Sequence, residues 1–251
     1  MGSRESKFIE FIGDISEIPL PSSLNNPFDY KPHLLCVIAS EQLQHHLINQ
    51  NNWNHNFGLS DNQPGKQIGK MFGVLVVQKE DQSIGFLAAF SGKLANKNNH
   101  EYFVPAVYDS LAEGEFLTPG MLKLKEINDK VKELKKQGNE DSNQLKQLKQ
   151  HRKLHSQQLQ KQLFESYQFS NSNKERKNPY EIFGSNPPAG AGECAAPKLL
   201  QYAFQNNLKP LAIAEFWWGV SPSINTESRK HKEFYPACED KCRSVLGWML
   251  R

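Results

Sequence analysis

The strongest constraint on the fold is a long amphipathic segment between Leu122 and Phe164. Apolar residues recur there at steps of three and four, a period that places them along one face of an α-helix. The polar stretch QGNEDSN interrupts the pattern, and its Gly138 favours a helical hairpin over one continuous rod. The arms are too short and too interrupted for a sustained coiled coil. We therefore predict a basic helical hairpin over residues 121–168.

The segments on either side of the hairpin contain short apolar runs typical of strands, alternating with helices. Before it, MFGVLVV and SIGFLAAFSG predict two paired strands, and HLLCVIAS predicts another, after which Ser40 would cap a helix. After it, AAPKLLQYAFQN predicts a helix, LAIAEFWWG a buried strand and EDKCRSVLGWML a final helix.

These elements predict an α/β fold of the α+β kind, with small sheets and the hairpin inserted between them. The chain would consist of four parts. They are residues 1–120, an N-terminal α/β unit; 121–168, the basic hairpin; 169–191, a linker rich in Pro and Gly; and 192–251, a C-terminal Cys-bearing α/β unit.

Composition and the length of the apolar runs exclude several classes of protein. The chain is 38% hydrophobic and 23% charged, which is typical of a globular protein with a core. No apolar run is long enough for a bilayer span, and the N-terminus lacks the pattern of a secretory signal. The glycines form neither a GxxxxGK[ST] nor a GxGxxG phosphate-binding loop. We expect a cytoplasmic protein with no membrane association.

Positive charge is concentrated on the predicted hairpin, although the net charge of the chain is only +3. Residues 121–165 contain eleven Lys or Arg against six Asp or Glu. Such a surface is either a solvated helix exterior or a contact for RNA phosphates, where Lys and Arg displace counterions and binding weakens with salt. On the second interpretation, the phosphate contacts are Lys135, Lys136, Lys149, Arg152 and Lys153.

A second candidate RNA contact lies at the end of the strand LAIAEFWWG. Alternation along a strand would leave only one of Trp217 and Trp218 pointing outward, and an exposed Trp can stack on an unpaired base. We assign this role to Trp218, beside the nearby cations Arg229, Lys230 and Lys232. The alternative is that the indole fills the core or an interface, as Trp commonly does.

Four cysteines in a chain expected to be cytoplasmic indicate thiol or metal chemistry and not a disulfide framework. Cys36 lies within an apolar run and is assigned to the core. Cys238 and Cys242 would face the same side of a helix, and Cys194 opens another helix, where amide dipoles favour a thiolate. These three are candidate ligands of a structural zinc ion, although such sites usually have four ligands and CxxC spacing. The alternative is three small thiols packed in the interior.

The same region partly resembles the signature of the zinc deaminases, in which [HC]xE is followed by PCxxC. Here Glu193 precedes Cys194 instead of following it by two positions, and the later pair is spaced CxxxC. A zinc-dependent nucleoside or RNA deaminase, with Glu193 as the proton shuttle, is therefore an alternative function. His231 is a further candidate for a fourth ligand or a general base.

Six runs of unusual composition occur in order between about His33 and Leu250. They are IGKMFGVLVV, GFLAAFSGKL, PPAGAGECAAPKLLQYAF, LAIAEFWWG, HKEFYPAC and CRSVLGWML. Together they resemble the long N-terminal region that precedes the catalytic domain in some bacterial RNA pseudouridine synthases of the RluA type. The resemblance implies a role in RNA modification, with structured RNA (rRNA or tRNA) and a pseudouridine synthase catalytic domain as partners.

The motif that performs the chemistry in that family is absent from this sequence. The family's catalytic domain carries HRLDxxTSG, whose Asp isomerises uridine, and none of the Asp residues here is preceded by HRL. The resemblance therefore implies an accessory region without isomerase activity of its own. A further alternative is a protein-docking module that binds a catalytic subunit through the apolar stripe of the hairpin, at Ile127 and Val131.

Overall fold

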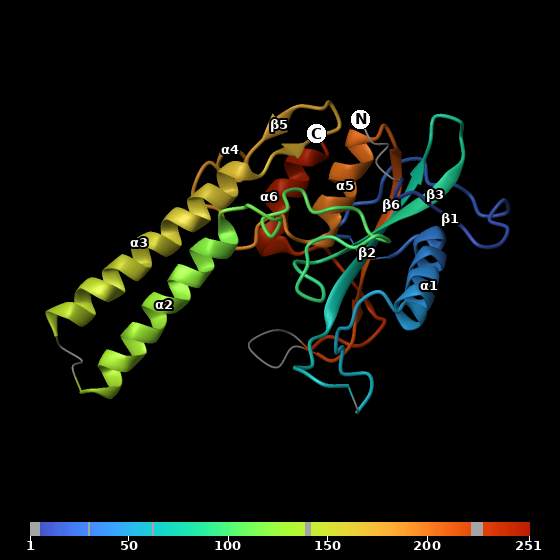
Figure 1. Cartoon of the computed structure of the whole chain (residues 1–251). Helices are drawn as coiled ribbons and strands as arrows, with labels where there is room; N and C mark the ends of the chain where they lie inside the picture. Colours follow the sequence, from blue (N-terminus) through green and yellow to red (C-terminus); the bar gives the residue numbers. More distant parts are fainter. Residues whose placement is uncertain (1–5, 30, 62, 139–141, 222–227) are drawn as a thin grey trace.

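The computed structural model describes residues 6–29, 31–61, 63–138, 142–221 and 228–251. Figure 1 shows a body built on a sheet, from which two long helices project side by side as an arm. The elements in chain order are β1 (Ile9–Glu10), α1 (Leu34–Asn49), β2 (Lys70–Gln78), β3 (Ile84–Phe90), α2 (Leu117–Lys136), α3 (Asn143–Ser166), β4 (Phe169–Ser170), β5 (Arg176–Lys177), α4 (Pro179–Phe183), α5 (Ala195–Gln205), β6 (Lys209–Trp218), β7 (Phe234–Tyr235) and α6 (Glu239–Met249).

The body is organised around a five-stranded antiparallel sheet in the order β1-β3-β2-β6-β7, and β4 and β5 form a separate two-stranded sheet. This confirms the predicted α/β class with small sheets and an inserted hairpin. Strand β2 pairs with β3 on one side and with β6 on the other. The predicted units 1–120 and 192–251 are therefore not separate, because each supplies strands to the same sheet.

Helices cover both faces of the sheet, so the body has three layers. Alternate residues of each strand point to opposite faces. On one face, Phe72, Val74 and Phe216 form a core with α1. On the other face, Leu75 and Ile213 pack with α5 and α6. Because both faces are covered, the strand interiors are apolar almost throughout, as the unbroken runs in the sequence indicated.

The run HLLCVIAS is the start of helix α1, so its prediction as a strand is wrong. His33 is the N-cap residue, and its Nδ1 accepts a hydrogen bond from Leu35 N at 3.2 Å. The buried residues recur at helical spacing along α1, and they are Leu35, Cys36, Ala39, Ser40, Leu43 and Leu47. Ser40 is thus a buried interior position and not the predicted cap. Cys36 lies in the core, as predicted.

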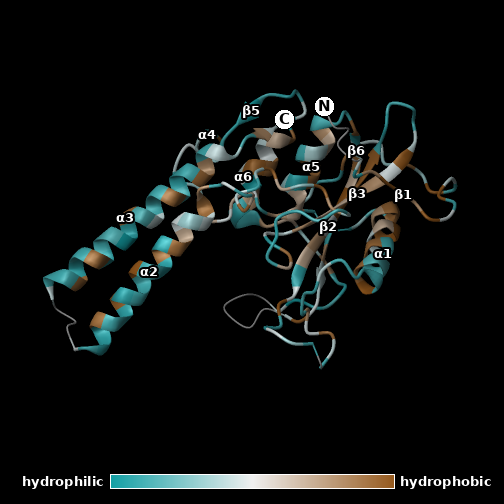
Figure 2. Cartoon of the chain, in the orientation of Figure 1, coloured by the Kyte–Doolittle hydropathy of each residue, from teal (hydrophilic) through white to brown (hydrophobic). Residues whose placement is uncertain are grey.

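The predicted helical hairpin is present as α2 and α3, which pack against each other. Gly120 brings the helices close at the base, since an added Cβ there would lie 2.3 Å from Leu159 Cδ2. Ile127 is only 5% exposed, so it is buried in the contact between the two helices. The predicted docking surface at Ile127 and Val131 is therefore wrong, because that stripe holds the hairpin together. Figure 2 shows the mainly hydrophilic exterior of the arm.

The predicted linker, residues 169–191, contains β4, β5 and the short helix α4. Phe169 is fully buried, and α4 packs on α6. Helix α4 begins with a capping box, in which Asn178 and Glu181 satisfy each other's backbone N–H groups. The segment is thus part of the body, and its Pro and Gly residues shape turns on the surface.

Candidate functional site

The structure brings together the three cysteines that the sequence singled out. Cys194 and Cys238 are the N-cap residues of α5 and α6, and Cys242 lies in the first turns of α6. The two helices pack side by side on the same face of the sheet. All three thiols are free, and they hydrogen-bond with one another. Two helix starts separated by a long stretch of chain therefore form one thiol cluster, defined as Cys194, Cys238 and Cys242.

Two glycines allow the start of α5 to reach this position. A Cβ at Gly73 in β2 would lie 2.9 Å from Ala195 Cβ and 3.2 Å from Leu199 Cδ1, so α5 could not pack as closely on any other residue. Gly192, with φ +80°, turns the chain into the helix, and it faces the ring of Phe169. The approach of α5 to β2 sets where Cys194 meets the start of α6.

The hydrogen bonds within the cluster favour a single thiolate, at Cys238. Donation from Cys194, then from Cys242, lowers the pKa of Cys238 to about 2, and the backbone N–H of Lys241 contributes further. The pKa of Cys194 is raised by its hydrogen bonds to these two cysteines and by burial. For Cys242, the contact with Cys194 lowers the pKa, but Cys238 and burial raise it overall to about 12. Cys238 is half-buried, whereas Cys242 is fully buried.

The acidic group beside the thiols is Glu215 of β6, which the sequence analysis did not single out. It is 4% exposed, and its Oε1 accepts a hydrogen bond from Ala196 N at 3.2 Å. This bond caps α5 from the sheet, since the N-cap residue Cys194 makes no side-chain capping bond. Burial raises the pKa of Glu215 to about 7, against the opposing effect of the Ala196 hydrogen bond. The available signal was one acid inside the apolar run LAIAEFWWG.

Glu193, the predicted proton shuttle, lies in a neighbouring group of charged residues. The hydroxyl of Tyr167 donates to Glu193 Oε1 at 3.4 Å. Lys198 is nearly fully buried, and its Nζ donates to the carbonyl oxygens of Phe90 at 2.8 Å and Gly92 at 3.0 Å. Burial lowers the pKa of Lys198 to about 8, and the charge of Glu193 opposes that shift. The carboxyl that acts on the thiols is thus Glu215 and not Glu193.

The structure does not present the thiols as a preformed metal site. Within the described residues, no group of three or more His, Cys, Asp or Glu side chains is arranged to hold a metal ion. His231, the predicted fourth ligand or base, lies elsewhere: its Nδ1 accepts from Gly219 N at 3.0 Å, and its ring lies 4.4 Å from that of Trp218. Zinc binding by Cys194, Cys238 and Cys242 remains a prediction.

The hairpin residues predicted to contact RNA all lie on the surface of the arm. Five side chains are exposed, and they are Lys135, Lys136, Lys149, Arg152 and Lys153. Arg152 Nη1 donates to Asn128 Oδ1 at 3.3 Å across the hairpin, on the exposed side. The structure therefore leaves these cations available to a ligand.

Trp218 is not exposed, so its predicted role as a stacking platform is wrong. It is 2% exposed and belongs to the core on the α1 face. Trp217 is buried as well, and its Nε1 donates to Val220 O at 3.0 Å. The alternation along β6 holds, but both faces of the strand are covered. Neither indole can therefore reach a base.

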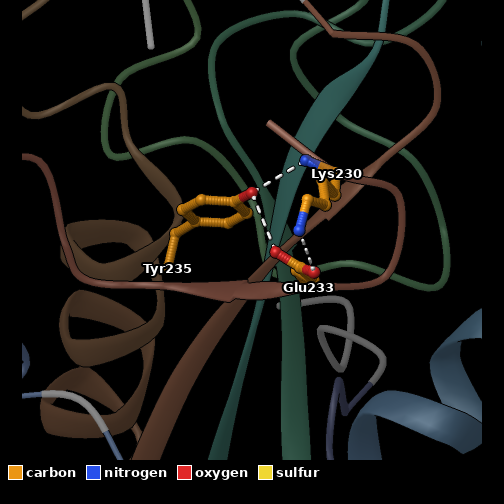
Figure 3. Close-up of polar contacts among 3 residues, drawn as sticks. All are labelled: Lys230, Glu233 and Tyr235. Carbon is orange, nitrogen blue, oxygen red and sulfur yellow. Dashed lines mark hydrogen bonds and ion pairs between the residues drawn. The ribbon is translucent and has the colours of Figure 1, made fainter. Parts of the chain in front are cut away.

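The three cations near Trp218 make contacts within the chain. The guanidinium of Arg229 lies 5.3 Å from the centre of the Trp217 ring and 5.1 Å from that of Tyr235. Lys230 Nζ forms an ion pair with Glu233 at 3.3 Å, and Lys230 N donates to the hydroxyl of Tyr235 at 2.7 Å (Figure 3). Lys232 Nζ lies 5.8 Å from the Trp218 ring. These contacts hold the segment before β7 against the sheet.

Comparisons with known proteins provide no relative for this chain. It matches no protein-family model, no curated protein and no solved structure. Across the helices that the structure describes, none combines the length and apolar character needed to cross a membrane.

Proposed function

We propose that this chain is an RNA-binding accessory module that acts beside a pseudouridine synthase catalytic domain of the RluA type, and that the α2–α3 hairpin contacts the RNA. The sequence resemblance supplies the context of RNA modification. The basic surface of α3 is the single observation that carries the binding role.

Helix α3 has the charge and shape of a polyanion-binding element. Its 24 residues extend for about 36 Å. It contains five Lys or Arg, which are Lys146, Lys149, Arg152, Lys153 and Lys161, against the single acid Glu165. Lys149, Arg152 and Lys153 are spaced at i, i+3 and i+4, so they lie on one face. That face can follow the phosphates along one side of a structured RNA.

The cations on this face are not neutralised by neighbouring acids. The ion pairs found on the described part of the hairpin are Lys132–Asp129 and Lys161–Glu165, both exposed. None of the five candidate phosphate contacts belongs to an ion pair among the residues described. Exposed, unpaired cations release the counterions of RNA when they bind phosphate, which makes affinity depend strongly on salt.

The test is RNA binding over a salt series, with a structured rRNA fragment and a tRNA as ligands. The variant Lys149→Gln, Arg152→Gln, Lys153→Gln should bind at least about tenfold more weakly at low salt, and its slope of log K against log salt should fall by about two to three. The matched control removes three exposed cations from the body, with Lys66, Lys97 and Lys209 changed to Gln. Equal affinities for the two triple variants would refute the assignment.

A further inference from the structure

We propose that the thiol cluster is a peroxide-oxidation site, at which Cys238 is oxidised and Cys194 then forms a reversible disulfide with it, joining the starts of α5 and α6. This inference concerns the body of the molecule. It does not depend on RNA binding by the hairpin.

The position of the thiols makes Cys238 the reactive one. Its sulfur is half-buried, so a small oxidant can reach it, while Cys36 and Cys242 are fully buried. The sulfur accepts hydrogen bonds from two thiols and from the backbone N–H of Lys241. A partly exposed cysteine at a helix start, surrounded by donors, has the environment of a nucleophilic thiolate.

Cys194 is the partner best placed to form the disulfide. It approaches Cys238 from a different helix, and both are N-cap residues with extended backbone, at φ −69° and −60°. Cys238 and Cys242 share one helix, where side chains lean in the same direction. A disulfide requires side chains that point toward each other, which favours the pair from two helices. Cys242 then acts only as a hydrogen-bond donor.

The reaction with hydrogen peroxide balances in two steps. The Cys238 thiolate attacks one peroxide oxygen and the O–O bond breaks, which yields a sulfenic acid on Cys238 and a hydroxide ion that takes up a proton. The sulfur of Cys194 then attacks the Cys238 sulfur; the S–O bond breaks, the S–S bond forms and a second water leaves. Two thiols lose two electrons and two protons, and peroxide is reduced to two waters. A small thiol reductant reverses the disulfide.

The test treats the full chain, purified in the reduced form, with hydrogen peroxide and locates each thiol by alkylation and peptide mass spectrometry. The expected product is a Cys194–Cys238 cross-linked peptide that dithiothreitol removes. Cys238 should be consumed at least about tenfold faster than Cys36 or Cys242. The variant Cys194→Ser should retain a sulfenic acid on Cys238 that dimedone traps. The control Cys36→Ser should still form the disulfide.

Two results would overturn the proposal, and both are obtained with the unmodified sequence. One is loss of Cys238 no faster than loss of the buried cysteines, or a disulfide that joins Cys238 to Cys242. The other is stoichiometric zinc in the same preparation, with thiols that resist peroxide until a chelator removes the metal, because the cluster would then be a metal site.

Discussion

Glu215 shows how a single residue connects the sheet, a helix and the thiol cluster. Its position on β6 directs the carboxyl to the α5 face, where it accepts the hydrogen bond from Ala196 N and lies near the charge of Cys238. A buried carboxylate loses its hydration, so burial raises its pKa despite the capping bond. The residue therefore stabilises the start of α5 at a cost that depends on pH.

The first prediction concerns the pH dependence of stability. The pKa of Glu215 is about 7 in the folded chain against an ordinary value of 4.5. Because the folded value is the higher one, its contribution to stability is fully present below about pH 4.5 and is lost as the pH rises through 7. The variant Glu215→Gln stays neutral and keeps an amide oxygen for the Ala196 N–H. Relative to this variant, the native chain should lose on the order of 3 kcal/mol of unfolding free energy between pH 4.5 and 8.

Urea unfolding of both proteins across that pH range measures the difference directly. Titrations elsewhere in the chain affect both proteins equally and cancel. Parallel stability curves for the native chain and the Gln variant would show that the carboxyl titrates normally in the folded state.

At the scale of elements, the contact between α5 and β2 decides the geometry of the cluster. The helix lies against the sheet at Gly73, where there is no room for a Cβ beside Ala195 and Leu199. Most of the α5 residues, from Ala195 to Leu200, are buried. Small residues on both sides of the contact thus hold the helix close enough for Cys194 to meet α6.

Substitution of Gly73 by Ala should destabilise the fold by about 1–3 kcal/mol, because the added methyl group forces α5 away from the sheet. The matched control is Gly247→Ala in α6, where an added Cβ meets nothing within 4 Å. That control should be neutral or stabilise by up to about 1 kcal/mol, since Ala favours a helix over Gly. Chemical denaturation measures both variants. Equal stability of Gly73→Ala and the native chain would mean that α5 is not held by this contact.

At the scale of the whole molecule, the hairpin and the body are largely independent. Helices α2 and α3 pack mainly on each other, and the end of α3 contacts α4 (Figure 1). The arm beyond the base therefore supplies charged surface to solvent and little to the core. This division separates the proposed RNA contact from the thiol cluster.

Replacing residues 129–151 with a short Gly-rich turn should leave the body folded, because the Gly120–Leu159 contact at the base is retained. The thermal midpoint should change by only a few degrees at most, which is the shift expected when about 1 kcal/mol or less is lost. Circular dichroism should show lower helix content and a cooperative transition. A chain that no longer unfolds cooperatively would show that the arm is an integral part of the core.

The sequence by itself determined the elements whose pattern is local and long. The helical hairpin follows from apolar spacing with a polar break, and the β2–β3 pair follows from two apolar runs joined by a polar loop. Short runs were ambiguous: HLLCVIAS is as apolar as a buried strand, and only its continuation at helical spacing identifies α1. The burial of Trp218 could not be predicted either, because alternation does not say whether a strand is covered on both faces.

Only the tertiary structure decided what lies in the candidate site. Cys194 and Cys238 are 44 residues apart, and nothing in the local pattern states that their helices start side by side. They meet because β2 pairs with β6, far along the chain, and because Gly73 lets α5 pack closely on that pair. The same pairing places Glu215 under the thiols. Periodicity reports which face of an element is buried, whereas the partner that buries it is chosen by the fit of surfaces distant in sequence.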